Sequence, residues 1–330
     1  FARFIERSGG SPCDTPARAI AAIIAFFILL SVLLGAMQFA SHRDPEPEEL
    51  LAEHILPAPP PLVAAAPDGP ETLDLGENPD LRPAVDEVVA GTLVVDLSMG
   101  EFILRPGPAD EPLRVEADFD ASQFELEETY STDEDGRWTY NVKFGGKGGF
   151  FGMMFRGGAN NPRNRVEIIV PQGHPIRLVG EVGMGESKMD LGGLWVEEVD
   201  LELGMGDHFM EVREPMPVPM KSFAVEASMG EIEIRGLGDA SPEVVHVEHG
   251  MGDLFLDLQG AWRRDAEVTA DFRMGQCRIW VPKSAHIELS GGSVSMGESS
   301  TRLPDVELPD GAPTVRLDAS GSMGNLEIEY

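Results

Sequence analysis

Residues 196–212, VEEVDLELGMGDHFMEV, contain the pattern on which the fold prediction depends. Three apolar residues alternate with polar ones before Met205, as in a β-strand with one buried face: Val199, Leu201 and Leu203. After Gly206 the alternation resumes at His208, one position out of phase. A phase change of one residue requires a bend or bulge, and glycine readily adopts the positive φ that such a bend uses. The stretch therefore predicts two half-buried strands joined at Met-Gly.

The dipeptide Met-Gly recurs with similar flanks along the chain. From the second copy on, successive methionines are separated by 21, 24, 22, 23, 22 and 27 residues. A near-constant period of this length is typical of stacked repeat units. The eight copies are Met99-Gly100, Met184-Gly185, Met205-Gly206, Met229-Gly230, Met251-Gly252, Met274-Gly275, Met296-Gly297 and Met323-Gly324.

These repeats predict an all-β domain over residues 91–330. We expect a β-solenoid-like stack of units of ~22 residues, because such units bury a continuous core only when stacked. The Met side chains are expected to point inward and form an internal ladder. Strand-like runs in 113–144 and 165–182 are expected to complete the N-terminal end. The alternative is a β-sandwich of hairpins with Met-Gly at each tip.

The N-terminal part predicts a membrane anchor. Residues 19–40 carry no charged side chain, and 22 residues in a helix cover ~33 Å, enough for a bilayer core of roughly 30 Å. Arginines before this span and acidic residues after it place the N-terminus inside. We therefore predict a cytoplasmic segment 1–18, a transmembrane helix 19–40, a Pro-rich acidic linker 41–90 and a periplasmic β domain at the inner membrane.

Composition excludes several functional classes. The formal net charge of −32, from 25 basic and 57 acidic residues, argues against a nucleic-acid partner, which requires basic groups to neutralise phosphates. Two cysteines exclude a disulfide-rich scaffold and a four-cysteine zinc site. The sequence contains no recognisable catalytic constellation, so we predict no enzyme activity, no cofactor, no metal and no small-molecule substrate.

Two groups of residues resemble metal ligands, and both are better explained otherwise. The acids that follow Met-Gly would stack in a row, which suits either Ca²⁺ or a solvated face. One acid per repeat is fewer than calcium-binding solenoids use, which favours the solvated face. His246 and His249 are three residues apart, so a strand would direct them to opposite faces, and His249 is expected in the core.

The Gly-rich run FGGKGGFFGMMFRGG (144–158) is the candidate contact segment. Apolar side chains among glycines either tuck under the body or mark a surface for a partner or a membrane. We expect the latter, with the contact made by Phe144, Phe150, Phe151, Met153, Met154, Phe155 and Arg156.

The stretches VEIIVPQGHPIRLVGEVGMGESKMDLGG (166–193) and VEEVDLELGMGDHFMEV (196–212) resemble the toast-rack and adhesin-like domains, which are membrane-tethered bacterial β-repeat domains. These are related to the C-terminal domains of cell-wall-active antibiotic response proteins. The resemblance covers roughly residues 91–330 and implies a stacked β fold without catalytic residues. The Met in each turn and the insertion at 144–158 depart from the family pattern.

Together these features predict a non-enzymatic, single-pass accessory or structural subunit of a larger membrane complex, for example a respiratory or photosynthetic assembly. Its partners would be the membrane and integral-membrane subunits, reached through the helix, the linker and loop 144–158. The alternative is a cell-envelope stress regulator or an adhesin.

Overall fold

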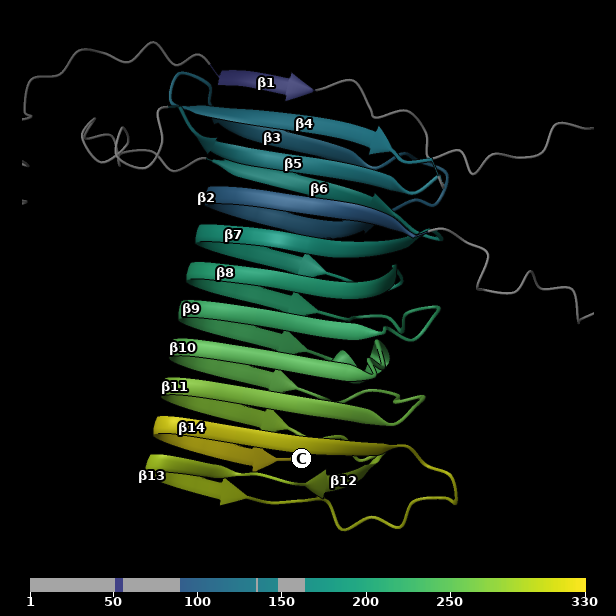
Figure 1. The fold of residues 1–330 in the computed structure, drawn as a ribbon, viewed down its shortest axis with the longest axis vertical. Helices are drawn as coiled ribbons and strands as arrows, with labels where there is room; N and C mark the ends of the chain where they lie inside the picture. The colour runs from purple at the N-terminus through teal and green to yellow at the C-terminus, as the bar shows by residue number, and fades with distance from the viewer. Residues whose placement is uncertain (1–50, 56–89, 135, 148–163) are drawn as a thin grey trace, which may run out of the picture. The chain divides into compact units, whose positions relative to one another are not determined.

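Long bent strands lie side by side in a single 14-stranded sheet (Figure 1). The computed structural model describes residues 51–55, 90–134, 136–147 and 164–330. The described residues fall within one unit, Leu50–Tyr330. The all-β prediction is therefore confirmed for this part of the chain. The predicted transmembrane helix 19–40 lies outside the described residues, among which no helix is long and apolar enough to cross a membrane.

Six long strands form the middle of the sheet. They pair in parallel in the order β7-β8-β9-β10-β11-β14. Each contains one Met-Gly within the strand, and each methionine is aligned with that of its neighbour. The sandwich of hairpins with Met-Gly at each tip is therefore wrong. The strands are β7 (Pro175–Asp190), β8 (Trp195–Glu211), β9 (Ser222–Arg235), β10 (Val244–Asp257), β11 (Ala266–Trp280) and β14 (Thr314–Glu329).

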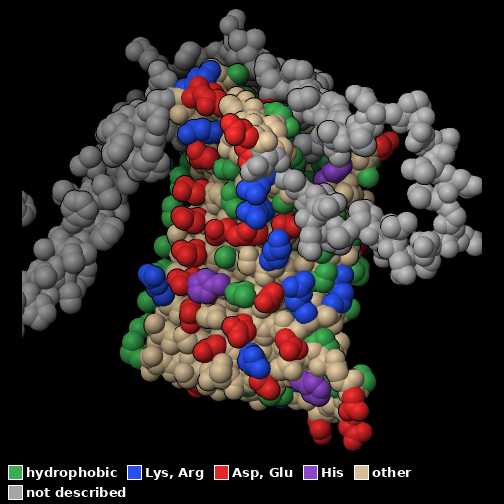
Figure 2. Space-filling view, turned by 45° about the vertical axis from the view of Figure 1, so that its right-hand side comes forward, with side chains coloured by type: hydrophobic (Ala, Val, Ile, Leu, Met, Phe, Trp, Pro, Cys, Tyr) green, Lys and Arg blue, Asp and Glu red, His purple; other side chains and the backbone are tan. Residues whose placement is uncertain are grey.

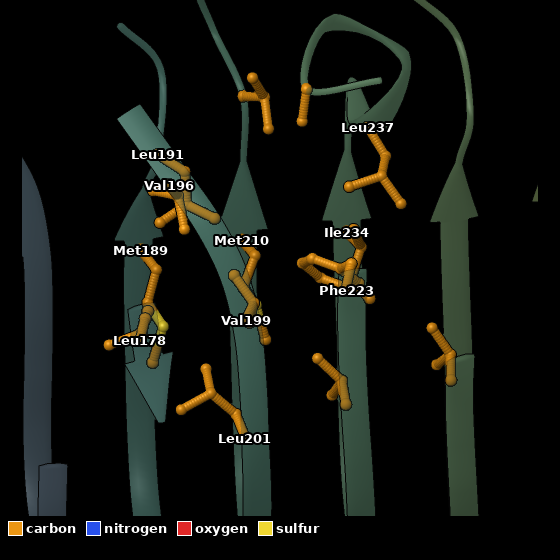
Figure 3. Packing of buried hydrophobic residues seen from close by; sticks show 14 of the residues in the cluster. Leu178, Met189, Leu191, Val196, Val199, Leu201, Met210, Phe223, Ile234 and Leu237 are labelled. Atoms are coloured by element: carbon orange, nitrogen blue, oxygen red, sulfur yellow. The ribbon is translucent and has the colours of Figure 1, made fainter. Parts of the chain in front are cut away.

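The two halves of each bent strand enclose a common interior. In these six strands the residues two, four and six positions before Met are buried, except the half-buried Gly180. The residues three and five positions after Met are buried too, as the alternation predicted. Figure 3 shows residues from the two halves close together: Leu178 with Met189, Val199 with Met210, and Phe223 with Ile234. One apolar cluster thus runs the length of the stack, and burial of this surface is its main stabilising term.

The N-terminal end is built differently. β2 (Gly91–Gly107) pairs with β7 from Gly91 to Leu104, but on its other side two short strands share one level. β5 (Trp138–Gly146) follows the first half of β2, and β6 (Arg165–Pro171) follows the second half. Antiparallel strands then cover these: β4 (Phe124–Thr132) on β5, β3 (Arg114–Asp120) on β6, and β1 (Leu51–Ile55) on β3. β1 lies within the predicted linker 41–90.

At the C-terminal end the order in space departs from the order in sequence. The final strand, β14, is inserted between β11 and two shorter strands, β12 (His286–Leu289) and β13 (Ser293–Thr301). The Met296 copy is therefore outermost, and the Met323 copy lies between Met274 and Met296. A short 3-10 helix, Leu237–Asp239, lies in the connection between β9 and β10.

Candidate functional site: the Met-Gly edge

The strands bend along one edge of the stack (Figure 1). Met-Gly lies between the two halves of each strand, where the parity of the buried residues changes, and the copies are aligned. We call the eight Met-Gly pairs with their flanking residues the Met-Gly edge. The bend glycines have φ between 127° and 154°. At Gly252 a Cβ would lie 1.9 Å from the carbonyl oxygen of Gly230 in the neighbouring strand. Only glycine accommodates both this conformation and this close approach.

The methionines of this edge point outward, so the predicted internal ladder is wrong. Their exposed fractions are 47% for Met205, 45% for Met229, 43% for Met251, 42% for Met274, 60% for Met296 and 39% for Met323. Met99 and Met184 are half-buried. The physical reason is the bend of the strand. The side chains two residues before and three residues after Met, such as Leu203 and His208, fill the interior of the bend. The residues between them, Met included, therefore lie on the outer side of the bend.

Two rows of carboxylates flank the methionines. Three residues before Met, the register aligns Asp96, Glu181, Glu202, Glu226, Glu248 and Asp271. Two residues after Met, it aligns Glu101, Glu186, Asp207, Glu231 and Asp253. Figure 2 shows acidic side chains in columns along the stack. Among the described residues no group of three or more His, Cys, Asp or Glu side chains is placed to hold a metal ion.

A groove of about 580 Å³ runs beside the first row of acids. One wall carries Glu202, Glu226, Glu248 and Asp271, and small residues such as Ser228 and Gly250 widen it. Arg273 and His249 also line it. Alternation alone could not reveal this groove, because its shape depends on the small residues that precede Met in successive strands.

The side chains best suited to chemistry are enclosed in the interior. His208 is 2% exposed, and its Nδ1 lies 2.9 Å from Ser187 Oγ. His249 is 1% exposed, as expected for a core histidine, and Cys277 is fully buried. Burial lowers the pKa of both histidines and raises the pKa of the Cys277 thiol to about 12. His249 also lines the groove, whereas His208 and the protonated thiol of Cys277 are enclosed in the core.

Phe144 was predicted to make an outward contact, and this prediction is wrong. It is fully buried at the N-terminal end, stacked on Phe124 at 5.5 Å and packed edge-on against Phe119 at 5.3 Å. Phe144 aligns with Leu97 of β2, so it occupies an interior column. The strand alternation at Trp138, Tyr140 and Val142 was the signal that the neighbouring glycines obscured.

The other predicted contact residues, Phe150, Phe151, Met153, Met154, Phe155 and Arg156, lie outside the described residues. The anchors of this segment are described, however. β5 ends at Gly146, and the backbone N–H of Glu101 donates to the carbonyl of Asn164, just before β6. The described residues on the two sides of this segment therefore lie beside Met99-Gly100, at the position of the next Met-Gly bend.

A second pocket, of about 460 Å³, lies at the C-terminal end. Leu303, Val306 and Leu308 of the last long connection line it together with Ile287 of β12. Leu303 and Val306 are 37% and 49% exposed. Lys283, His286, Glu288 and Thr314 also line the pocket, so its lining is mixed and not apolar. The only sequence signal for this pocket is the run LPDVELP (303–309), which is apolar at every second or third position.

A model described as the N-terminal domain of toast_rack, DUF2154, matches residues 76–235. These residues belong to the toast-rack family. The predicted family resemblance is thus confirmed there. The toast-rack match ends at Arg235, the last residue of β9, whereas the Met-Gly strands continue in register through β10, β11, β14 and β13.

One solved structure similar to this chain is that of a candidate cell adhesion protein from Clostridium sporogenes. The two share 13% sequence identity, and the alignment covers 74% of this chain and 94% of that chain, with a TM-score of 0.40. No curated protein sequence matches the chain.

Proposed function

We propose that this protein is a non-enzymatic, membrane-anchored accessory subunit that acts in the cell envelope through protein–protein contacts of its β domain. The observation that carries the proposal is the separation of interior and surface. The reactive groups His208, His249 and Cys277 are enclosed in a continuous core, whereas the outer surface presents aligned rows of Met and carboxylate side chains. Such a body is suited to rigid display and not to turnover.

We interpret the bent parallel strands as a β-solenoid. Parallel stacking with Met aligned on Met repeats the same surface at each level, ~4.8 Å apart. A solenoid is quasi-one-dimensional and offers an extended surface, which is the usual use of such folds in binding. The match of residues 76–235 to the toast-rack domain is compatible with this use.

The anchor belongs to the same proposal. The uncharged span 19–40, with arginines before it and acids after it, supports a single-pass helix with the β domain outside the cytoplasm. The acidic, Pro-rich segment 41–90 supports a linker that holds the domain away from the bilayer. Protease added outside spheroplasts should then digest the chain beyond residue 40, and full protection of the β domain would contradict this topology.

Purification of the full chain in mild detergent tests the subunit role. We expect a complex of fixed stoichiometry with integral-membrane proteins; recovery as a free monomer would instead favour an envelope-stress regulator or an adhesin. The joint change of Phe150, Phe151 and Phe155 to Ser should reduce co-purification without lowering the melting temperature. Phe144→Ser is the matched control, because it removes a buried ring and should lower the melting temperature.

A further inference from the structure

The methionines of the Met-Gly edge are not required by packing. A core position must be apolar, but six of these methionines are 39–60% exposed. At that exposure a polar residue would satisfy packing equally well. The adjoining position before Met varies among Ser, Gly and Arg, whereas the corner itself is Met in all eight copies. The thioether is the property that separates Met from every other apolar side chain, and it is a soft metal ligand.

The stack sets the spacing of these thioethers. Met205, Met229 and Met251 are directly aligned on three adjacent parallel strands, which lie ~4.8 Å apart. A zinc–sulfur bond is about 2.3 Å, and two sulfurs on opposite sides of one cation at that distance lie about 4.6 Å apart. The backbone spacing of neighbouring strands is close to this separation, so aligned thioethers can approach one cation from two adjacent strands. We propose that the Met205–Met229–Met251 ladder binds a monovalent soft cation, copper(I) or silver(I), through thioether sulfurs of adjacent strands.

The charge around these three methionines favours a cation. Glu202 and Asp207 flank Met205, Glu226 and Glu231 flank Met229, and Glu248 and Asp253 flank Met251. Within the described part of the chain, five of these acids form no ion pair; the sixth, Glu248, lies 3.2 Å from His246. Because no cluster of hard ligands exists among the described residues, the carboxylates act through their field and do not complete a Ca²⁺ site.

The same edge is less suited to cations elsewhere. Arg273 precedes Met274, and the acid after Met-Gly is replaced by Gln276 and Asn325 in β11 and β14. At the other end, Lys188 Nζ lies 3.7 Å from Glu186 and 3.6 Å from Glu101, which places a positive charge beside Met184. The site is therefore limited to three levels in the middle of the stack.

The test is a calorimetric titration of the purified full chain with silver nitrate in chloride-free buffer. Both thiols are first replaced, by Cys13→Ser and Cys277→Ala, because thiolates would compete for silver. The test variant then carries Met205→Leu, Met229→Leu and Met251→Leu, which retain an apolar edge but remove three sulfurs. The matched control carries Met210→Leu, Met216→Leu and Met220→Leu, which remove three buried sulfurs.

We expect the test variant to bind silver at least about tenfold more weakly than its parent, and the control variant to bind as the parent does. In the parent labelled with ¹³C at the Met methyl groups, the resonances of Met205, Met229 and Met251 should shift on titration. Copper(I) affinity, measured in the presence of a reductant against a chromogenic competitor, should likewise be lower for the test variant than for the parent and the control variant. Equal silver affinity in the test variant and the parent would overturn the proposal and leave the edge as an apolar contact surface.

Discussion

The middle of the stack and its two ends consist of related strands, but they differ in how the inward side chains are covered. In β7 to β11 and β14 every strand has a parallel neighbour on both sides, and its inward side chains are almost completely buried. In β13 the equivalent inward positions after Met-Gly are Ser299 and Thr301, and both are exposed. The N-terminal end instead closes its core with the Phe124 and Phe144 rings under antiparallel strands.

The difference teaches how a repeating core can end. A terminal strand has one neighbour only, so apolar inward residues there would face water or invite pairing with another chain. The C-terminal end avoids this with a polar last strand, and the N-terminal end with a separate aromatic layer. We therefore expect mutations in the middle to cost much more than matched mutations at the ends.

The largest contrast is expected between two glycines of positive φ. Gly252→Ala should lower the free energy of unfolding by about 4 kcal/mol or more, because its Cβ would lie 1.9 Å from the Gly230 carbonyl oxygen in addition to the φ strain. Gly311→Ala is the control, with φ 87° and no atom within 4 Å of the added Cβ, and should cost only about 1–2 kcal/mol. Denaturant titration of both variants measures the difference, and equal losses would contradict the tight stacking of the bend.

A smaller contrast is expected between two leucines. Leu256→Ala in β10 removes a fully buried side chain and should cost about 2–5 kcal/mol. Leu289→Ala in β12 removes a half-buried one at the C-terminal end and should cost less than about 1.5 kcal/mol. A comparable loss in both would mean that the terminal strands carry as much of the stability as the middle.

The sequence predicted most of the middle and little of the ends. Alternation and its phase change at Met-Gly identified the inward columns, because one-sided burial produces period two directly. The direction of Met251 could not be read from the same pattern: it has the parity of the buried residues before it, and only the bend turns it outward. The insertion of β14 beside β11 depends on long-range pairing, on which local periodicity carries no information.

The features of the candidate site also fall into those that local sequence predicted and those that depend on the fold. Its Met-Gly repeat and flanking acids were visible in the sequence, whereas their alignment across strands and the exposure of the methionines required the structure. Phe144 shows the opposite error, since a Gly-rich neighbourhood suggested a surface loop where the strand continues into the core. Composition around a residue was therefore a poorer guide than the phase of its strand.

Acidification should destabilise the middle of the stack through its buried histidines. Burial lowers the pKa of His208 and His249 below the ordinary value of 6.5. Stability is then full above about pH 6.5 and falls as the pH decreases toward the folded-state pKa, because the unfolded chain binds protons first. The loss should be about 1 kcal/mol per pH unit for each histidine.

Melting curves between pH 7.5 and 5.5 measure this dependence. His208→Leu with His249→Leu should flatten it, and Leu suits both sites because Leu254 and Leu203 fill the same columns in other strands. The control His286→Gln changes an exposed residue at the C-terminal end and should leave the dependence unchanged. If stability still falls with decreasing pH in the variant with both histidines replaced, the pH dependence arises from the carboxylates.

The smallest effect is expected at the Met-Gly edge itself. Met251 is 43% exposed, so Met251→Ser should change the free energy of unfolding by no more than about 0.5 kcal/mol. Met210→Ser is the matched change in β8: that side chain is 1% exposed, and its loss should cost about 2–5 kcal/mol, with a further cost for burying a hydroxyl. Thermal denaturation of the two variants measures the pair. If Met251→Ser destabilises as strongly as Met210→Ser, the methionine ladder contributes to the packing of the bend and is not free to act as a ligand surface. If the two differ as expected, the middle of the stack separates stability from function within each strand, because the interior columns hold the fold while the corner residues are available for binding.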